Sequence, residues 1–288
     1  MVLARRDSMK GLAKRCFLYK PLLSMAVVCA MFCQPMATAQ DSILTVEVPN
    51  GPSIELVWVE GGTFTMGSNS GINRRHQYDA NRPEHQVSVR GFYMGCTEVT
   101  QRLWKAVMDT NPSVFVGDSL PVDNVTWTEA QQFVTLISQL TGLRFRLPRE
   151  AEWEYAARGG IKAQGNLYAG CNRQQLADCA WYCVNSERRV HPVALLGPNE
   201  LGLYDMSGNV AEWCLDWMAP YDSKQQTDPS GPASGDSRIL RGGHYNSVSA
   251  ACSVFDRSWY EPAAASEYFG MRLVLEPDEG DGEELPVQ

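Results

Sequence analysis

The stretch GLYDMSGNVAEWCLDW, residues 202–217, combines aromatic, glycine and carboxylate residues more closely than its surroundings, and the rest of the chain is interpreted from it. It contains three aromatic residues, two glycines, one asparagine and three carboxylates. Its apolar positions follow neither the helical nor the strand period, so it is neither an amphipathic helix nor an ordinary strand. This composition predicts an ordered, non-repetitive backbone.

Within this stretch, two carboxylates frame a glycine turn. Asp205 and Glu212 flank Gly208 and Val210, whose main-chain carbonyls fall between them. Calcium and other hard cations bind this mixture of carboxylate and main-chain oxygens. The spacing is not that of an EF-hand loop, however, and carboxylates beside a turn also bond its N–H groups. The residues alone favour a turn without metal and leave calcium as the alternative.

Residues 1–39 have the pattern of an export signal. Basic side chains are spread over residues 5–20, an apolar run follows at 22–33, and the motif ATA ends at Ala39. A segment this short with such flanks is typical of a cleaved signal rather than a membrane span. We predict cleavage after Ala39, with translation starting at Met1 or Met9. The mature protein is then periplasmic, attached to the cell envelope or secreted, without a transmembrane segment.

The charge balance excludes one class of partner. The chain carries a formal net charge of −8, and loss of the basic leader makes the mature protein more negative. Nucleic acid and anionic membrane surfaces are therefore not expected partners. The acidic residues at 276–288 predict a disordered, solvated tail.

Cysteine usage indicates disulfide bonds. Three of the nine cysteines lie in the leader, and six remain after its removal. An even number in an exported chain favours disulfides, although the pairing does not follow from sequence. A zinc site at the Cys179 and Cys183 pair is the weaker alternative, because no histidine lies nearby in the sequence. The six are Cys96, Cys171, Cys179, Cys183, Cys214 and Cys252.

Short periodic segments predict an α+β fold with little regular secondary structure, in one domain at residues 40–275. Strands are expected at 54–66 and 86–94, with shorter strands at 238–240 and 270–274. Three helices are expected between them. The first is capped by Thr100 and ends at 111–112, the second is capped by Thr128 with Gln131 and ends at Gly142, and the third runs from Pro148 to 159–160.

Several blocks of sequence follow one another in a recognisable order. They are GGTFTMGS (61–68), GFYM (91–94) with EVTQ (98–101), RLPREAEWEYAARGG (146–160), the stretch at 202–217, RGG (241–243) and GMRL (270–273). Together they resemble the formylglycine-generating enzyme, or sulfatase-modifying factor, domain family. The resemblance covers roughly residues 54–275. It implies a fold similar to an elaborated C-type lectin fold.

The resemblance also implies a chemistry. Enzymes of this family oxidise a cysteine of a sulfatase to formylglycine, using oxygen and a copper ion bound by two cysteines. Counted from the Gly-Gly pair, those positions are Ser247 and Cys252 in this chain. A hydroxyl is a poor ligand for Cu(I), so Cys252 lacks its partner thiolate. His244, which replaces the family's serine after the Gly-Gly pair, is a conceivable second ligand that neither the spacing nor the family supports.

Cys252 therefore has two competing interpretations. It is either a catalytic thiol or a structural half-cystine paired with Cys214, and oxidation is the usual state of an exported cysteine with an available partner. We expect the disulfide, which would remove the copper chemistry.

The calcium interpretation gains support from the resemblance. The family's second calcium site aligns with Asp205, Gly208, Val210 and Glu212, where the glycine and valine positions contribute main-chain oxygens. Asp205 replaces an asparagine of the enzymes, and the added charge suits a hard cation. With the resemblance included, we expect calcium at this turn.

These observations favour a calcium-stabilised, catalytically degenerate domain that binds an exported protein, peptide or glycan. The alternatives are a copper-dependent oxidase of a client cysteine and a structural subunit of an envelope assembly. Three arginines could line a ligand groove, and three tryptophans could form a ligand platform, but we expect structural roles for all six. They are Arg241, Arg257, Arg272, Trp213, Trp217 and Trp259.

Overall fold

The second half of the 202–217 stretch forms a strand, β7 (Ala211–Trp217), which the sequence did not predict. Five of its seven residues are buried, and because they lie on both faces of the strand, the usual alternation of buried and exposed side chains is absent. The computed structural model describes residues 43–69 and 80–277. The predicted export signal at 1–39 and most of the predicted tail at 276–288 lie outside the described residues.

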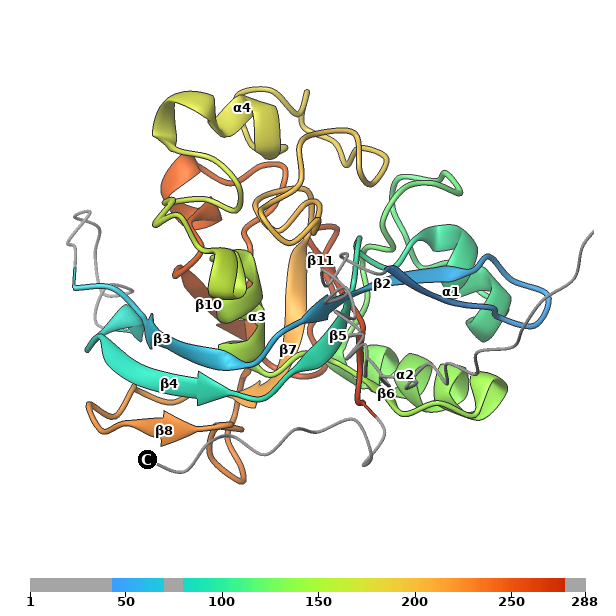
Figure 1. Cartoon of the computed structure of the whole chain (residues 1–288). Coiled ribbons are helices and arrows are strands. Elements are labelled where there is room, and N and C mark those ends of the chain that lie inside the picture. Colours follow the sequence, from blue (N-terminus) through green and yellow to red (C-terminus); the bar gives the residue numbers. More distant parts are fainter. Residues whose placement is uncertain (1–42, 70–79, 278–288) are drawn as a thin grey trace, which may run out of the picture. The chain divides into compact units, whose positions relative to one another are not determined.

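Strand β7 is the centre of a four-stranded sheet in the order β10-β9-β7-β11. It pairs antiparallel with β9 (Arg238–Arg241), so that Glu212 lies opposite Arg241. It pairs parallel with β11 (Phe269–Gly270), and β9 pairs with the outer strand β10 (Arg257–Tyr260). Figure 1 shows β7 running beside α3, between segments that are far apart in the sequence.

Two further sheets complete the strand framework. The five-stranded sheet has the order β1-β2-β5-β12-β6 and the three-stranded sheet the order β3-β4-β8. Their strands are β1 (Ile43–Val46), β2 (Ile54–Val59), β5 (Phe92–Gly95), β12 (Val274–Leu275), β6 (Phe145–Arg146), β3 (Gly62–Met66), β4 (His85–Val89) and β8 (Gln226–Thr227).

The chain passes from one sheet to another inside segments that the sequence predicted as single strands. Between β4 and β5 it turns at Gly91, where an added Cβ would lie 2.4 Å from the Trp58 ring, so only glycine fits. The predicted strand 270–274 is likewise divided into β11 and β12, with Arg272 between them. Apolar alternation persists across such turns, which is why one strand was predicted in place of two.

Helix α1 (Gln101–Met108) begins where predicted. Thr100 is its N-cap and accepts a hydrogen bond from Leu103 N, while the helix ends at Asp109 in the left-handed region, before the predicted 111–112.

Helix α2 (Trp127–Thr141) ends at Gly142 as predicted, but its predicted cap is wrong. Thr126 and Glu129 form the capping box, in place of Thr128 and Gln131. Both pairs fit the capping-box pattern. The Glu129 carboxylate accepts from Thr126 N at 2.8 Å, a stronger bond than the neutral Gln131 amide could accept, and the Trp127 indole is fixed by a 2.9 Å hydrogen bond to Cys214 O.

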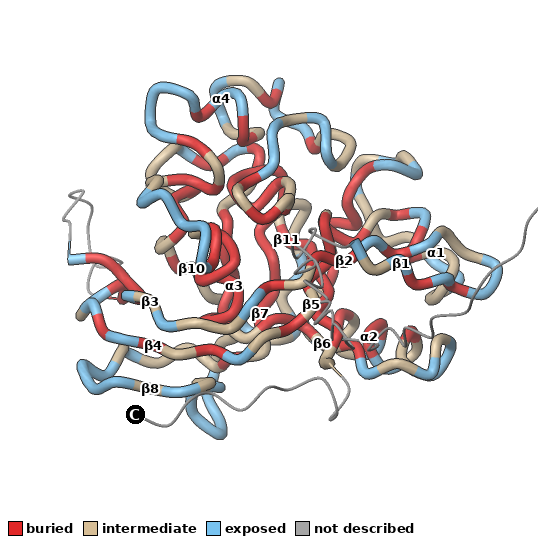
Figure 2. The backbone as a smooth tube through the Cα atoms, in the orientation of Figure 1, coloured by how far each residue is buried: buried red, intermediate tan, exposed pale blue. Residues whose placement is uncertain are grey.

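Helix α3 (Glu150–Ala157) is buried along its whole length, as Figure 2 shows. It contacts β3, β4, β7 and β9, and therefore lies between the three-stranded and four-stranded sheets. The short helix α4 (Leu176–Cys179) and several 3-10 turns occupy the irregular region that follows. The predicted α+β fold with little regular secondary structure is confirmed. Within the described ranges no helix combines the length and the apolar character needed to cross a membrane.

Candidate functional site

Four buried side chains meet where β5, β7 and the break between β11 and β12 converge. Glu98, Asp205, Glu212 and Arg272, here called the acidic cluster, are each at most 4% exposed. Arg272 Nη2 lies 2.7 Å from Glu212 Oε1, and Arg272 Nε lies 3.0 Å from both oxygens of that carboxylate. Arg272 also donates to the carbonyls of Gly95 and Tyr204, which fixes its orientation.

The acidic cluster contains more negative than positive groups. Burial raises the pKa of Glu98 well above its usual range, and the charges of Asp205 and Glu212 raise it further. Burial also raises the pKa of Asp205 to about 6. Three carboxylates share the single guanidinium of Arg272 within the cluster, so full ionisation leaves buried negative charge. Such charge requires protons or a further cation.

Glu98 was not predicted as a site residue. Its two oxygens accept hydrogen bonds from Asn209 Nδ2 at 2.7 Å and from Val210 N at 3.0 Å, both in the 202–217 stretch. Glu98 follows β5 in the EVTQ block, between Thr97 and Val99, and a carboxylate just past the end of an apolar strand was the available sequence signal.

The turn at residues 205–209 depends on its glycine. Gly208 has φ +86°, and an added Cβ would lie 2.1 Å from Trp181 O. Asp205 and Asn209 also adopt positive φ, which short polar side chains tolerate better than most. Asn209 N donates to Trp181 O, so the turn is attached to the 181–183 segment.

The acidic cluster offers buried negative charge and carboxylate oxygens, which are donors that calcium prefers. Asp205 and Glu212 supply carboxylates, and Gly208 and Val210 lie between them with their main-chain oxygens. Glu212, however, is oriented by Arg272 and by Trp153 Nε1, which donates to Glu212 Oε2 at 2.7 Å. Among residues 43–69 and 80–277, no three His, Cys, Asp or Glu side chains are arranged as a metal site. Both oxygens of Glu212 thus accept hydrogen bonds from protein donors, and calcium binding by the predicted set stays a prediction.

The loop after the Gly-Gly pair carries the residues predicted for copper chemistry. Ser247 Oγ accepts a hydrogen bond from His244 N at 3.1 Å, and the fully buried Cys252 donates its thiol to Val248 O. Burial raises the pKa of Cys252 strongly, with smaller contributions from Asp256 and Cys183. The thiol is therefore protonated and weakly nucleophilic at neutral pH.

His244 is held by an aromatic contact. Its ring stacks on Tyr268 with centroids 4.1 Å apart, and burial lowers its pKa to about 4, so the imidazole is neutral. With Ser247 in place, this loop offers a single thiol, which does not fit a copper site built from two thiolates.

The cysteine pairing differs from the expectation. Cys171 and Cys179 form a disulfide, with Cα atoms 6.4 Å apart. Cys214 and Cys252 are both unpaired, so the predicted bond between them is not formed. The reason is their placement: Cys214 belongs to the core packed on α3, whereas Cys252 packs in a separate cluster with the disulfide.

The predicted structural roles of Arg241 and Arg257 are confirmed. Arg257 Nε and Nη2 lie 2.6 Å and 2.8 Å from the two oxygens of Glu150, and Arg241 pairs with Glu154. Both arginines are at most 2% exposed.

The tryptophans also occupy structural positions. Trp213 is fully buried and donates to Val125 O, and Trp259 packs against the core beside α3. Trp217 stacks on Trp127, with the Arg238 guanidinium 3.5 Å from its ring centroid.

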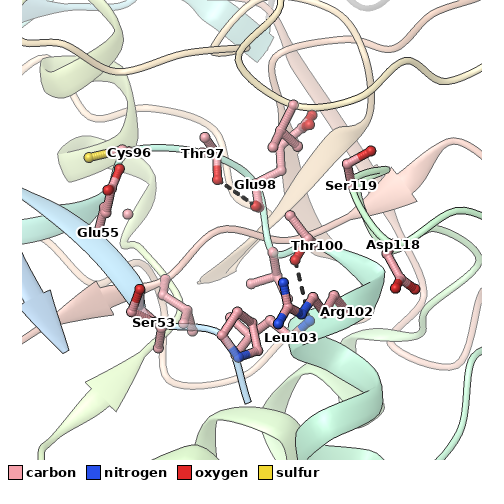
Figure 3. Close-up of a pocket in the computed structure, with 16 residues that line it drawn as sticks. Ser53, Glu55, Cys96, Thr97, Glu98, Thr100, Arg102, Leu103, Asp118 and Ser119 are labelled. Atoms are coloured by element: carbon pink, nitrogen blue, oxygen red, sulfur yellow. Dashed lines mark hydrogen bonds between the residues drawn. The ribbon is translucent and has the colours of Figure 1, made fainter. Parts of the chain in front are cut away.

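A surface cavity of about 390 Å³ opens beside the acidic cluster. Figure 3 shows Glu55 and Cys96 on one side and Arg102 and Asp118 on the other, with Glu98 between them. Burial and the nearby Glu55 carboxylate raise the pKa of Cys96 to about 11. The cavity is formed by segments around residues 53, 97, 118 and 193, and such long-range proximity has no local sequence signal.

Comparisons with known proteins show what this chain is similar to. The model of the sulfatase-modifying factor enzyme 1-like domain matches residues 44–277. The protein named chaperone protein LppX of Paenibacillus barcinonensis is 32% identical over 225 residues, covering 61% of this chain and 76% of that protein. The formylglycine-generating enzyme of Streptomyces coelicolor is 36% identical over 176 residues, covering 55% of this chain and 53% of that enzyme. The solved structure of Treponema denticola variable protein 1 superposes with a TM-score of 0.75 at 32% identity, covering 83% of this chain and all of that one.

Proposed function

The chain belongs to the sulfatase-modifying factor enzyme 1-like domain family, and we propose that it is an exported, calcium-stabilised, catalytically degenerate member that binds a protein or glycan partner in the cell envelope. The observation that carries the proposal is the acidic cluster, in which three buried carboxylates share the Arg272 guanidinium.

A bound calcium ion would balance this charge. The carboxylates of the cluster and the main-chain oxygens of the 205–212 turn are the donor types that calcium prefers. Without a cation, the raised pKa values of Glu98 and Asp205 indicate that proton uptake must relieve the repulsion. Calcium would therefore act mainly on stability, by binding the folded state.

The test is thermal unfolding of the full chain with calcium, with magnesium and with a chelator. Calcium at a hundredfold excess over its dissociation constant is expected to stabilise the protein by about 2.7 kcal/mol. Asp205→Ala should lose this response, whereas the exposed Asp236→Ala should keep it. A wild-type protein that unfolds identically in calcium and in chelator, and that shows no heat of calcium binding, would contradict the proposal.

Degenerate catalysis is supported by the loop at 244–252. Ser247 replaces a thiol, and Cys252 is buried and protonated. We expect no conversion of a sulfatase-type cysteine peptide to formylglycine in the presence of copper and oxygen, and mass spectrometry of the peptide measures this. Conversion by the wild-type protein would favour the copper-dependent oxidase instead.

Partner binding is supported by the cavity beside the cluster. Its volume of about 390 Å³ lies in the range of small-ligand sites. Its rim carries Glu55, Arg102 and Asp118, which offer both signs of charge to a polar peptide or sugar. A glycan array and an exported-peptide library test it, with Arg102→Ala expected to weaken binding and the exposed Arg173→Ala as the control. Ligands that bind Arg102→Ala and wild type equally would place the binding surface elsewhere.

A further inference from the structure

Four cysteines gather around the short 3-10 helix Ser249–Cys252, called η4. Cys252 shares one small buried cluster with the disulfide-bonded Cys171 and Cys179, together with Tyr168, Leu176 and Ala180. Cys183 follows Cys179 by four residues, and its backbone N donates to Ser247 O at 3.0 Å. Segments 167–183 and 247–252 are therefore held against each other.

Two further hydrogen bonds, both made by Ser207, join the same two segments. Ser207 Oγ donates to Cys252 O at 2.9 Å and accepts from Ala169 N at 3.2 Å. This fully buried hydroxyl joins η4 to the segment that leads into Cys171. The position of Cys252 relative to the disulfide segment is thus set by hydrogen bonds as well as by packing.

The two free thiols of this group have opposite environments. Cys183 is exposed, whereas Cys252 is fully buried and its Sγ lies against Gly243, where an added Cβ would come within 3.0 Å of the sulfur. Cys183 N is bonded to Ser247 O on the segment that leads into Cys252, and burial, Asp256 and then Cys183 raise the pKa of the Cys252 thiol. An accessible thiol beside a buried thiol is the arrangement of an attacking and a resolving cysteine.

We propose that Cys183 and Cys252 are a redox-active dithiol that closes to a disulfide when the protein meets a disulfide oxidant. The Cys183 thiolate attacks one sulfur of the oxidant, forming a mixed disulfide and releasing the other sulfur as a thiolate. Cys252 then loses its proton and attacks Cys183 Sγ, and the second thiol of the oxidant leaves. Two protein thiols are oxidised, one oxidant disulfide is reduced to two thiols, and no other reactant is required.

The bond would have a structural consequence outside the cysteine group. Trp181 O accepts the hydrogen bond of Asn209 N and lies against Gly208. Closing Cys183 onto η4 would therefore fix the segment that supports the 205–209 turn of the acidic cluster. The inference itself does not depend on calcium or on partner binding, because it concerns thiols alone.

Disulfide mapping of the full chain tests the proposal. The protein is kept under mild reductant that leaves Cys171–Cys179 intact, transferred to oxidised glutathione, quenched by alkylation and analysed by peptide mass spectrometry. Wild type and the control Cys214→Ser should yield a Cys183–Cys252 pair without retained glutathione. In Cys252→Ser, glutathione should remain on Cys183, and in Cys183→Ser, Cys252 should stay a free thiol.

Two outcomes would overturn the proposal. One is wild-type protein that keeps glutathione on Cys183 while Cys252 remains free. The other is a bond from Cys183 or Cys252 to Cys171 or Cys179, which would indicate exchange with the structural disulfide. If Cys252→Ser does not fold, as judged by circular dichroism, wild type and the exposed Cys183→Ser still decide between these results.

Discussion

Arg272 and Glu212 form a buried bidentate ion pair. Arg272 Nη2 lies 2.7 Å from Glu212 Oε1, and Arg272 Nε lies 3.0 Å from each oxygen of the Glu212 carboxylate. Neither side chain is more than 1% exposed. The pair connects β7 to the break between β11 and β12, and Arg272 is also the cation nearest to Glu98 and Asp205 in the acidic cluster. It therefore links two sheets and partly neutralises three carboxylates.

Replacing this arginine should be strongly destabilising. Arg272→Met leaves the carboxylates of Glu98, Asp205 and Glu212 without their guanidinium, and breaking a buried pair from one side costs about 3–5 kcal/mol. Urea unfolding in chelator measures the loss, and calcium should restore part of it. The exposed Arg102→Met should change the free energy of unfolding by no more than about 0.5 kcal/mol. Equal losses in the two variants would contradict the role given to Arg272.

Thr126 and Thr128 both fit the sequence pattern of an N-cap for α2, and substitutions distinguish them. Thr126→Ala removes the acceptor of Glu129 N, 3.1 Å away, and should cost about 1 kcal/mol. Thr128→Ala changes an exposed position within the first turn and should be nearly neutral. Chemical denaturation of both variants gives the comparison. A larger loss at Thr128 would move the helix start to the position first predicted from the sequence.

Local chemistry explains what the sequence did predict. The Thr100 cap, the Gly142 end of α2 and strands β2 and β3 depend on residues within a few positions of one another. The turn at Asp205 and Gly208 was recognised for the same reason, since its short polar and glycine residues select positive φ.

The missed features depend on contacts between distant segments. Strand β7 has no alternation because both of its faces are buried: Trp213 packs in one core cluster, and Cys214 packs in another together with α3. Glu98 accepts a hydrogen bond from Asn209, which lies 111 residues later in the chain. The sequence of the EVTQ block does not indicate this partner. The pairing of Cys171 with Cys179, rather than of Cys214 with Cys252, likewise follows from which core cluster each cysteine joins.

Asp216 should make stability depend on pH. Burial, followed by the nearby Glu150 charge, raises its pKa from 3.8 to about 7. The folded state therefore holds a proton that the unfolded state has lost, and stability falls as the pH rises from about 4 to about 7. Asp216→Asn keeps an oxygen acceptor for Glu150 N, which lies 2.7 Å from Asp216 Oδ2, and removes the charge. Its advantage over wild type should grow by on the order of 2 kcal/mol between pH 5 and pH 8.

Urea unfolding of Asp216→Asn and wild type across this pH range makes the comparison. The exposed Asp236→Asn is the matched control and should follow the wild-type curve. Parallel curves for Asp216→Asn and wild type would mean that Asp216 does not titrate in this window.

Restoring the second thiol should restore affinity for a soft metal. Ser247 and Cys252 lie on one loop, with Ser247 N bonded to His244 O at 2.8 Å and η4 beginning two residues later. Ser247→Cys is nearly isosteric and gives this loop two thiols, which Cu(I) prefers to a hydroxyl and a thiol. Competition against a chromophoric Cu(I) chelator should show binding at least about tenfold tighter than wild type, a difference of about 1.4 kcal/mol. The double variant Ser247→Cys with Cys183→Ser should bind equally well, because it excludes a new disulfide to Cys183. Equal affinity in wild type and Ser247→Cys would show that Ser247 is not the residue that prevents this loop from binding Cu(I).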